Sequence, residues 1–267
     1  RVPVTRRKYR FKVRALKPSD PISDKACCKK IKISLIEWAL GLRRDLSPEE
    51  EREVREAKEL FDSAFCTPEI VTMQHKLVGY AHYLGRASSM KHALMLAGPS
   101  DCRKSTTLTL LASGTGNFEK EARGAASTSA THSQQEKLKG SLMNKSVAVL
   151  DNARKLDMLL LKETATGTKE RTHHVSGTMP FLVTAMNHER APPEVSKDVS
   201  KKLIFVDGDK HMNVMENPDD SVIERVEDGE YAGGMAALIL RAISGGQAEF
   251  EVPDYREFIP QFVHDDK

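Results

Sequence analysis

Short, continuously apolar runs recur in the later part of the chain and predict the strands of a parallel β-sheet. They cover residues 92–97, 146–150, 181–185 and 203–206. A strand that is buried on both faces carries apolar side chains at every position, whereas a half-exposed strand alternates apolar and polar residues. Residues 105–113, between the first two runs, have the pattern of a helix. We therefore expect an α/β core, a parallel sheet flanked by helices, over residues 91–267.

The part of the chain before this core carries sequence signals at which helices begin. Ser47 is a favoured N-cap residue, and Glu50 completes a capping box with it, so these residues predict a helix that runs to about residue 65. A second helix is predicted over residues 67–84. Residues 21–90 are therefore interpreted as a small helical region that precedes the core.

The first residues of the chain, 1–20, are interpreted as a basic arm. Seven of the first 14 residues are basic and none is acidic: Arg1, Arg6, Arg7, Lys8, Arg10, Lys12 and Arg14. Tyr9 and Phe11 alternate with them, so the arm could hold phosphates and stack bases. The same pattern fits a solvated tail or an edge strand with alternating faces.

Composition excludes some classes of protein but does not identify a binding partner. The chain has 267 residues and a net charge of only +3, which is too small to indicate nucleic acid by itself. No window approaches the ~18 apolar residues that cross a bilayer, so no membrane partner is expected. The four cysteines lack CxxC spacing, which disfavours zinc and a disulfide framework and suggests a reducing, intracellular compartment such as cytoplasm or nucleus. Because the chain starts at Arg1 instead of Met, we expect it to be a portion of a longer protein.

The strongest chemical signal is a candidate phosphate-binding loop that follows the first apolar run and opens the predicted helix. Its residues are Gly98, Pro99, Ser100, Asp101, Cys102, Arg103, Lys104, Ser105 and Thr106. The template G-x-x-x-x-G-K-[ST] cradles phosphates with backbone N–H groups and a helix N-terminus. Lys104 would reach the β- and γ-phosphates of ATP, and the Ser105 hydroxyl would ligate Mg²⁺. Arg103 replaces the second template glycine, so either it tolerates the glycine conformation or the loop has lost tight nucleotide binding.

Polar residues follow two further apolar runs. Asp151 ends the second run and could hold the water shell of Mg²⁺, although it would also suit an N-cap. Asn187 follows the third run, where its amide could orient the attacking water or serve as an ordinary turn residue. The succession of loop, Asp and Asn at three strand ends is what a ring-forming NTPase requires, so Lys104, Asp151 and Asn187 are candidate catalytic residues.

On these residues, the stretch 70–206, about half the chain, resembles the superfamily 3 helicases of small DNA viruses and related replicons. The loop 98–105 resembles their Walker A motif, 147–153 their Walker B motif, and 180–187 their motif C. The resemblance implies a P-loop AAA+-like ATPase that uses ATP and Mg²⁺. It further implies a homo-oligomeric ring, a hexamer in this family, that acts as a DNA helicase or translocase in the replication of a virus or mobile element.

A basic cluster lies between the second and third apolar runs, where this family has a hairpin that projects into the ring channel. Lys169, Arg171, His173 and His174 are grouped closely enough to contact several phosphates from one loop tip. The resemblance implies that Lys169 and the histidines track single-stranded nucleic acid, with DNA favoured over RNA. A solvated charged turn is the alternative interpretation.

Three departures from the family pattern concern catalytic positions. Arg103 replaces the loop glycine, Asn152 replaces a second acid, and Lys201-Lys202 stand where relatives have an arginine finger. Lys202 is the candidate for that role, with Arg190 as a fallback, although lysine lacks the planar fork of arginine. A weakened NTPase fold that serves as a nucleic-acid-binding scaffold is therefore the alternative function. A small-molecule kinase would leave the basic cluster without a role.

Overall fold

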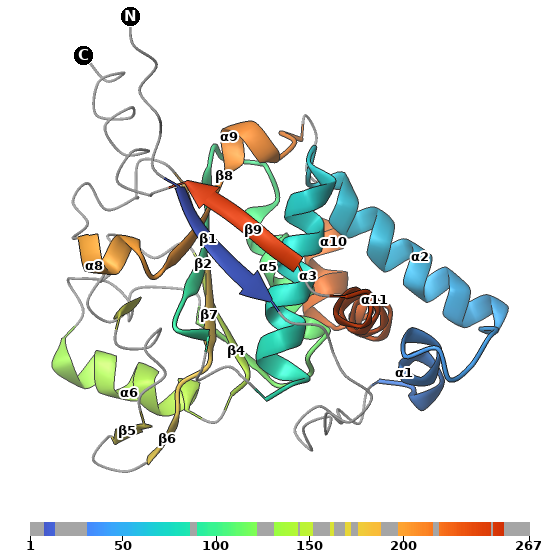
Figure 1. Cartoon of the computed structure of the whole chain (residues 1–267), viewed down its shortest axis with the longest axis horizontal. Helices are drawn as coiled ribbons and strands as arrows, with labels where there is room; N and C mark the ends of the chain where they lie inside the picture. Colours follow the sequence, from blue (N-terminus) through green and yellow to red (C-terminus); the bar gives the residue numbers. More distant parts are fainter. Residues whose placement is uncertain are drawn as a thin grey trace, which may run out of the picture.

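The computed structural model describes eleven stretches of the chain: residues 8–13, 31–85, 90–121, 131–143, 145–151, 161–162, 169–171, 176–187, 197–215, 219–246 and 248–253. Within these residues the fold is α/β, as the sequence predicts. Helices cover both faces of a central sheet (Figure 1).

The central sheet has five parallel strands. Its spatial order is β3 (Phe118–Glu121), β4 (Val147–Asp151), β7 (Phe181–Asn187), β2 (Ala93–Gly98) and β8 (Leu203–Asp207). The four apolar runs became β2, β4, β7 and β8, with bounds that differ from the prediction by at most two residues. Because β2 lies between β7 and β8, the candidate loop at the end of β2 has Asn187 and Asp207 at the neighbouring strand ends.

The apolar runs are continuous because each face of the sheet has its own core. Leu94 and Leu96 belong to the core beneath α3 (Pro68–His82), α5 (Lys104–Ser113) and α11 (Ala232–Ser244). Met95, between them, belongs to the core beneath α6 (His132–Leu142). Successive side chains of a strand point to opposite faces, so burial on both sides requires apolar residues throughout.

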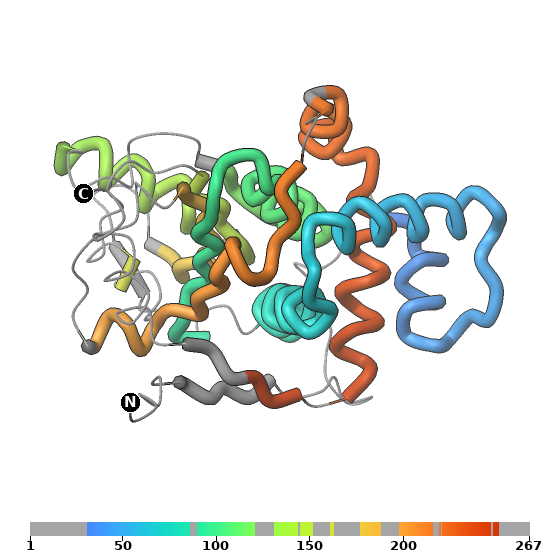
Figure 2. The backbone as a smooth tube through the Cα atoms, turned by 90° about the horizontal axis from the view of Figure 1, so that it is seen from above, coloured from blue at the N-terminus to red at the C-terminus, as the bar shows by residue number. Residues whose placement is uncertain are grey.

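The helical region forms around a helix from the far end of the chain. Helices α1 (Ile33–Ala39), α2 (Pro48–Ser63) and α3 all pack against α11, and Figure 2 shows α11 running beside them. Close approach of α2 to α11 depends on Gly234, where an added Cβ would lie within 3.0 Å of the Glu53 carbonyl carbon and the Ala57 side chain. The region predicted to precede the core therefore shares its packing with α11.

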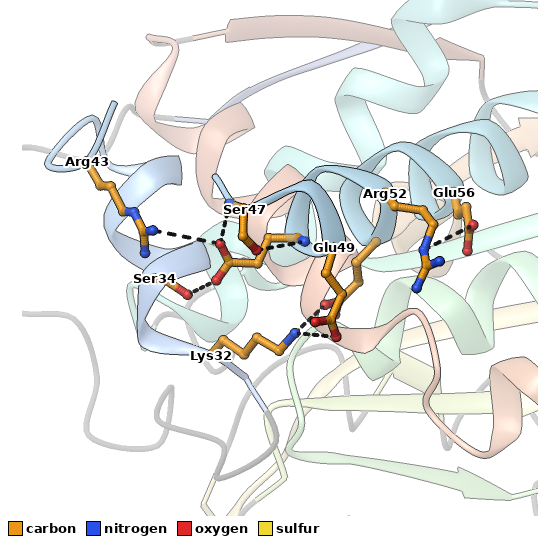
Figure 3. A network of polar contacts seen from close by, with 9 residues as sticks. Lys32, Ser34, Arg43, Ser47, Glu49, Arg52 and Glu56 are labelled. Atoms are coloured by element: carbon orange, nitrogen blue, oxygen red, sulfur yellow. Dashed lines mark hydrogen bonds and ion pairs between the residues drawn. The ribbon is translucent and has the colours of Figure 1, made fainter. Parts of the chain in front are cut away.

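A network of polar contacts joins α1 to the start of α2 (Figure 3). The predicted capping box is present, since the Ser47 hydroxyl accepts from Glu50 N and the Glu50 carboxylate accepts from Ser47 N. The Ser34 hydroxyl also donates to the Glu50 carboxylate. These hydrogen bonds lower the pKa of Glu50 to about 2, and the bond from Ser34 contributes most to this shift. Lys32 adds salt bridges to Glu49 and Glu53, each of 3.4 Å.

The basic arm contributes a strand. β1 (Lys8–Val13) pairs antiparallel with β9 (Ala248–Pro253), so the edge-strand interpretation holds for these six residues. In this register Arg10 lies opposite Glu251 and Lys12 lies opposite Glu249. Basic positions of β1 therefore share a face of the two-stranded sheet with acidic positions of β9.

Some elements differ from the prediction. The acidic stretch after residue 216, for which the sequence analysis predicts no element, contains helix α10 (Asp220–Glu227), in which Val226 is buried. Short elements complete the fold: β5 (Lys169–Arg171), β6 (Ser176–Thr178), α8 (Lys197–Ser200) and α9 (Gly208–His211). None of the described helices is long and apolar enough to cross a membrane.

Candidate nucleotide-binding site

The predicted phosphate loop lies between a strand and a helix. Gly98 is the last residue of β2 and Lys104 is the first residue of α5, so five residues connect the two elements. Thr106, in the first turn of α5, is buried. In this geometry the N-terminus of α5 points toward the loop, which is the arrangement that binds phosphate in other proteins.

Two residues of the loop adopt a conformation that glycine prefers. Arg103 has φ 54° and ψ 24°, and Asp101 has φ 60°. The left-handed region costs a residue with a Cβ about 1–2 kcal/mol. Arg103 therefore occupies the conformation of the missing template glycine, which was one of the two outcomes considered for this position.

The Lys104 side chain is held inside the loop. Only 6% of Lys104 is exposed, and its ammonium donates to the carbonyl oxygens of Gly98, at 3.2 Å, and Pro99. It also lies 3.4 Å from the Sγ of Cys102, whose thiol donates to Pro99 O. A positive charge thus lies at the centre of the loop, where phosphate oxygens would replace backbone carbonyls as its partners.

Ser105 and Asp151 meet at the end of β4. The Ser105 hydroxyl donates to Oδ1 of Asp151, and both residues are partly exposed. A hydroxyl and a carboxylate are hard oxygen donors of the type that Mg²⁺ prefers, with water completing its octahedral shell. These two residues therefore fit the predicted metal site.

Asn187 contacts the loop from the neighbouring strand. Its Nδ2 donates to the Ser100 hydroxyl at 3.2 Å, and Asn187 pairs with Gly98 in the register of β2 and β7. Asp151 pairs with Ala185 of the same strand. The predicted residues of the loop, Walker B and motif C are thus gathered at one edge of the sheet.

Lys202 is not part of this cluster. It precedes β8, and its carbonyl accepts from Ala93 N, at 2.8 Å, where β2 begins. The loop follows the C-terminal end of β2. Lys202 and Lys104 therefore lie at opposite ends of the parallel strands. Lys202 therefore cannot contact a nucleotide held by its own chain in this fold.

The predicted basic hairpin is formed by β5 and β6, which pair antiparallel. Lys169 and Arg171 are two positions apart on β5 and so share one face of the hairpin. His173 and His174 lie outside the described residues.

Two residues that the sequence analysis missed adjoin the loop. Asp207 ends β8, is only 5% exposed, caps α9 and forms a 2.8 Å salt bridge with Lys210. Gly208 follows, and a Cβ added to Gly98 would lie 2.9 Å from its Cα. An acid directly after an apolar run, the signal used for Asp151, was also present at Asp207.

Comparisons with known proteins agree at the level of the fold. No family model and no curated protein matches the chain. The C-terminal region of NrS-1 superposes with a TM-score of 0.50 at 11% identity, over 91% of this chain and 55% of that one. The two chains share a fold. JCV helicase, at 12% identity and a TM-score of 0.45, covers 78% of this chain and 60% of its own.

A third similar structure is SCCmec type IV Cch, described as an active helicase. It has 15% identity and a TM-score of 0.43, over 73% of this chain and 37% of its own. The chain thus spans between about a third and three fifths of these proteins.

Proposed function

We propose that the chain is the motor core of an ATP-dependent helicase or translocase that acts on single-stranded DNA in a viral or mobile-element replication system. The observation that carries the proposal is the meeting of Lys104, Ser105, Asp151 and Asn187 at one edge of a parallel sheet. Phosphoryl transfer needs a phosphate cradle, a metal site and a group that positions water, all close together.

Each of these residues has a role that follows from its contacts. The loop N–H groups and Lys104 would hold the β- and γ-phosphates of ATP, and Ser105 and Asp151 would hold Mg²⁺ with its waters. Bound Mg²⁺ would supply charge neutralisation on the phosphates. Asn187, whose amide already contacts the loop through Ser100, would orient the attacking water.

Engagement of DNA is assigned to the β5–β6 hairpin. Lys169 and Arg171 lie on one face of β5, and His173 and His174 stand between β5 and β6 in the sequence. Cations spaced along one strand can contact successive phosphates of a single strand. In a hexameric ring, hairpins from all subunits would line one channel.

A second candidate function is a nucleic-acid-binding scaffold with little ATP turnover. It is favoured by the side chain that Arg103 carries at the template glycine position and by the bonds that tie Lys104 to its own loop. The first adds bulk where glycine permits close phosphate approach, and the second occupies the ammonium that would bind phosphate.

ATP hydrolysis measured with and without single-stranded DNA separates the two functions. The wild type should hydrolyse Mg·ATP and be stimulated by DNA, and Lys104→Met should abolish both rates because the β- and γ-phosphates lose their cation. Lys169→Ala should keep basal hydrolysis and lose most of the stimulation. A wild type that binds DNA but hydrolyses ATP no faster than Lys104→Met is a scaffold.

A further inference from the structure

The segment that follows β8, residues 208–215, is called the post-β8 segment and contacts the phosphate loop at two points. Gly208 lies against Gly98 so closely that neither residue has room for a Cβ. Farther along, Met215 N–H donates to the Asp101 carbonyl at 3.0 Å. Asp101 is one of the two loop residues with positive φ, so this bond holds a carbonyl of the strained part of the loop.

The middle of the post-β8 segment is anchored to the junction between α2 and α3. Asn213 N–H donates to Ala64 O at 3.0 Å, and Asn213 Nδ2 donates to Ser63 O at 2.9 Å. Carbonyls at the end of a helix have no partner within the helix, so Asn213 supplies donors that the end of α2 lacks. His211 is hydrogen-bonded to Thr67 through Nδ1 and Oγ1 at 3.0 Å. Further bonds join Cys66 N to His211 O, at 3.1 Å, and the Cys66 thiol to Lys210 O, at 3.2 Å.

Beyond Met212, the path of the post-β8 segment is not explained by the burial of its side chains. Met212 is buried and forms an isolated bridge with Phe65, but Asn213 is exposed and Val214 is 61% exposed. Hydrogen bonds therefore fix residues 213–215 between the α2–α3 junction and the loop. The net contribution of each such bond is comparable to the strain of one left-handed residue.

We propose that the post-β8 segment positions the phosphate loop for nucleotide, and that Asn213 and Thr67 are positioning residues for nucleotide binding. The loop lacks a template glycine and holds Asp101 and Arg103 in left-handed conformations. The bond from Met215 stabilises that conformation only while the segment is anchored at its other end. The helical region is in this way part of the nucleotide site. The inference rests on the proposed nucleotide binding.

The test compares Asn213→Ala combined with Thr67→Val, which removes two of the three side-chain anchors and leaves that of Cys66, in two backgrounds. In the wild-type background the pair should weaken Mg·ADP binding about tenfold, the factor that one to two net hydrogen bonds supply. Exchange of amide hydrogens in a peptide that spans residues 99–104 should accelerate by a similar factor without nucleotide. In the Asp101→Gly background both effects should shrink to about twofold or less, since glycine adopts the left-handed conformation without strain. Asn117→Ala, which removes an Asn side-chain bond to Ser146 outside the segment, is the matched control and should change neither.

The outcomes separate this inference from the proposed function. If Mg·ADP binds and the paired substitution changes neither affinity nor loop exchange, or changes them equally in both backgrounds, the positioning role is wrong and the nucleotide site remains. If the wild type binds no Mg·ADP, the proposed function fails. In that case, faster exchange of the loop amide hydrogens in the paired variant, suppressed by Asp101→Gly, would show that the post-β8 segment still orders the loop.

Discussion

Arg103 occupies the one loop position at which the phosphate-binding template demands glycine. Its backbone is left-handed, and no side-chain cap satisfies the N-terminus of α5 that follows it. Among the described residues only Lys91, Asp101 and Arg103 are non-glycine residues with positive φ, and two of these three lie in the loop. Strain of this kind persists where surrounding contacts fix the backbone.

Arg103→Gly should stabilise the free chain. Glycine removes the contact between Cβ and the carbonyl oxygen that penalises left-handed backbone, and the gain exceeds the entropy that glycine adds to the unfolded chain. We expect an increase of about 0.5–1 kcal/mol in the free energy of unfolding, measured by urea denaturation.

A matched arginine in a helix should respond with the opposite sign. Arg52 is an exposed interior residue of α2, where glycine is unfavourable by about 1 kcal/mol. Arg52→Gly should therefore destabilise the chain. Destabilisation by both substitutions would mean that the left-handed position is not strained in solution.

The meeting of the site residues could be predicted because the chemistry falls at strand ends. Once apolar runs identify parallel strands, the residues that follow them share one edge of the sheet, which brought Ser105, Asp151 and Asn187 together. The sequence could not reveal that Lys104 bonds to its own loop, since that depends on backbone dihedrals. The sequence also could not show where Lys202 lies relative to the loop. The resemblance assigned a role to Lys202 but gave no information about its position in the fold.

Among the elements, α3 carries polar side chains into the core. His75 packs its ring 4.7 Å from that of Phe61, and Lys76 donates to Gly246 O at 2.7 Å. Within the described part of the chain, His75 Nε2 and both ring nitrogens of His82 have no hydrogen-bond partner. Burial lowers the pKa of each histidine to about 4, because the charged imidazolium loses its hydration.

These histidines should make the fold sensitive to mild acid. The unfolded chain binds protons near the ordinary pKa of about 6.5, while the folded chain resists protonation until about pH 4. Stability is therefore complete above pH 6.5 and falls as the pH falls through that window. At pH 5 the loss is about 2 kcal/mol for each histidine relative to pH 7.5.

Urea denaturation at pH 7.5 and 5.0 checks this expectation. His82→Leu should remove about half of the loss that the two buried histidines cause. His132 is exposed at the start of α6, and His132→Leu should leave the difference unchanged. A pH dependence that survives in a chain lacking both His75 and His82 would assign it to other groups.

Elements with a strong apolar signal could be predicted, and those with mixed signals could not. The capping box predicted a start directly after Ser47, as observed for α2, and the predicted end at about residue 65 lies two residues beyond the observed one. β3 was missed because its sequence, Phe-Glu-Lys-Glu, belongs to an edge strand that lacks a continuous apolar run. α10 was missed because its acidic residues obscured Val222 and Val226, which are four positions apart and face the core.

At the scale of the whole molecule, the two candidate cations lie at opposite edges of one sheet. Lys104 follows the loop after β2, and Lys202 is beside the first residue of that strand. The six residues of β2 span roughly 17 Å at the usual rise of a strand. A finger role for Lys202 therefore requires a second copy of the chain, as in the ring we propose.

Mixing two inactive variants should restore ATP hydrolysis if Lys202 acts on a neighbouring copy. Lys104→Met removes the phosphate ligand but keeps Lys202, and Lys202→Ala does the reverse. In a randomly mixed ring about a quarter of the interfaces combine an intact loop with an intact Lys202. We expect up to about a quarter of the wild-type rate from an equal mixture and almost none from either variant alone. Additive residual rates would exclude action between copies.

The pairing of β1 with β9 also sets an order of events during synthesis. Of the described strands, β1 is translated before the others, and its only described sheet partner is β9, residues 248–253. Ribosomes add about 5–20 residues per second, so β1 waits about 10–50 s for β9 to emerge. During that interval its alternating apolar positions have no partner strand, and an unpaired edge of this kind is a site where a nascent chain binds chaperones or joins other chains.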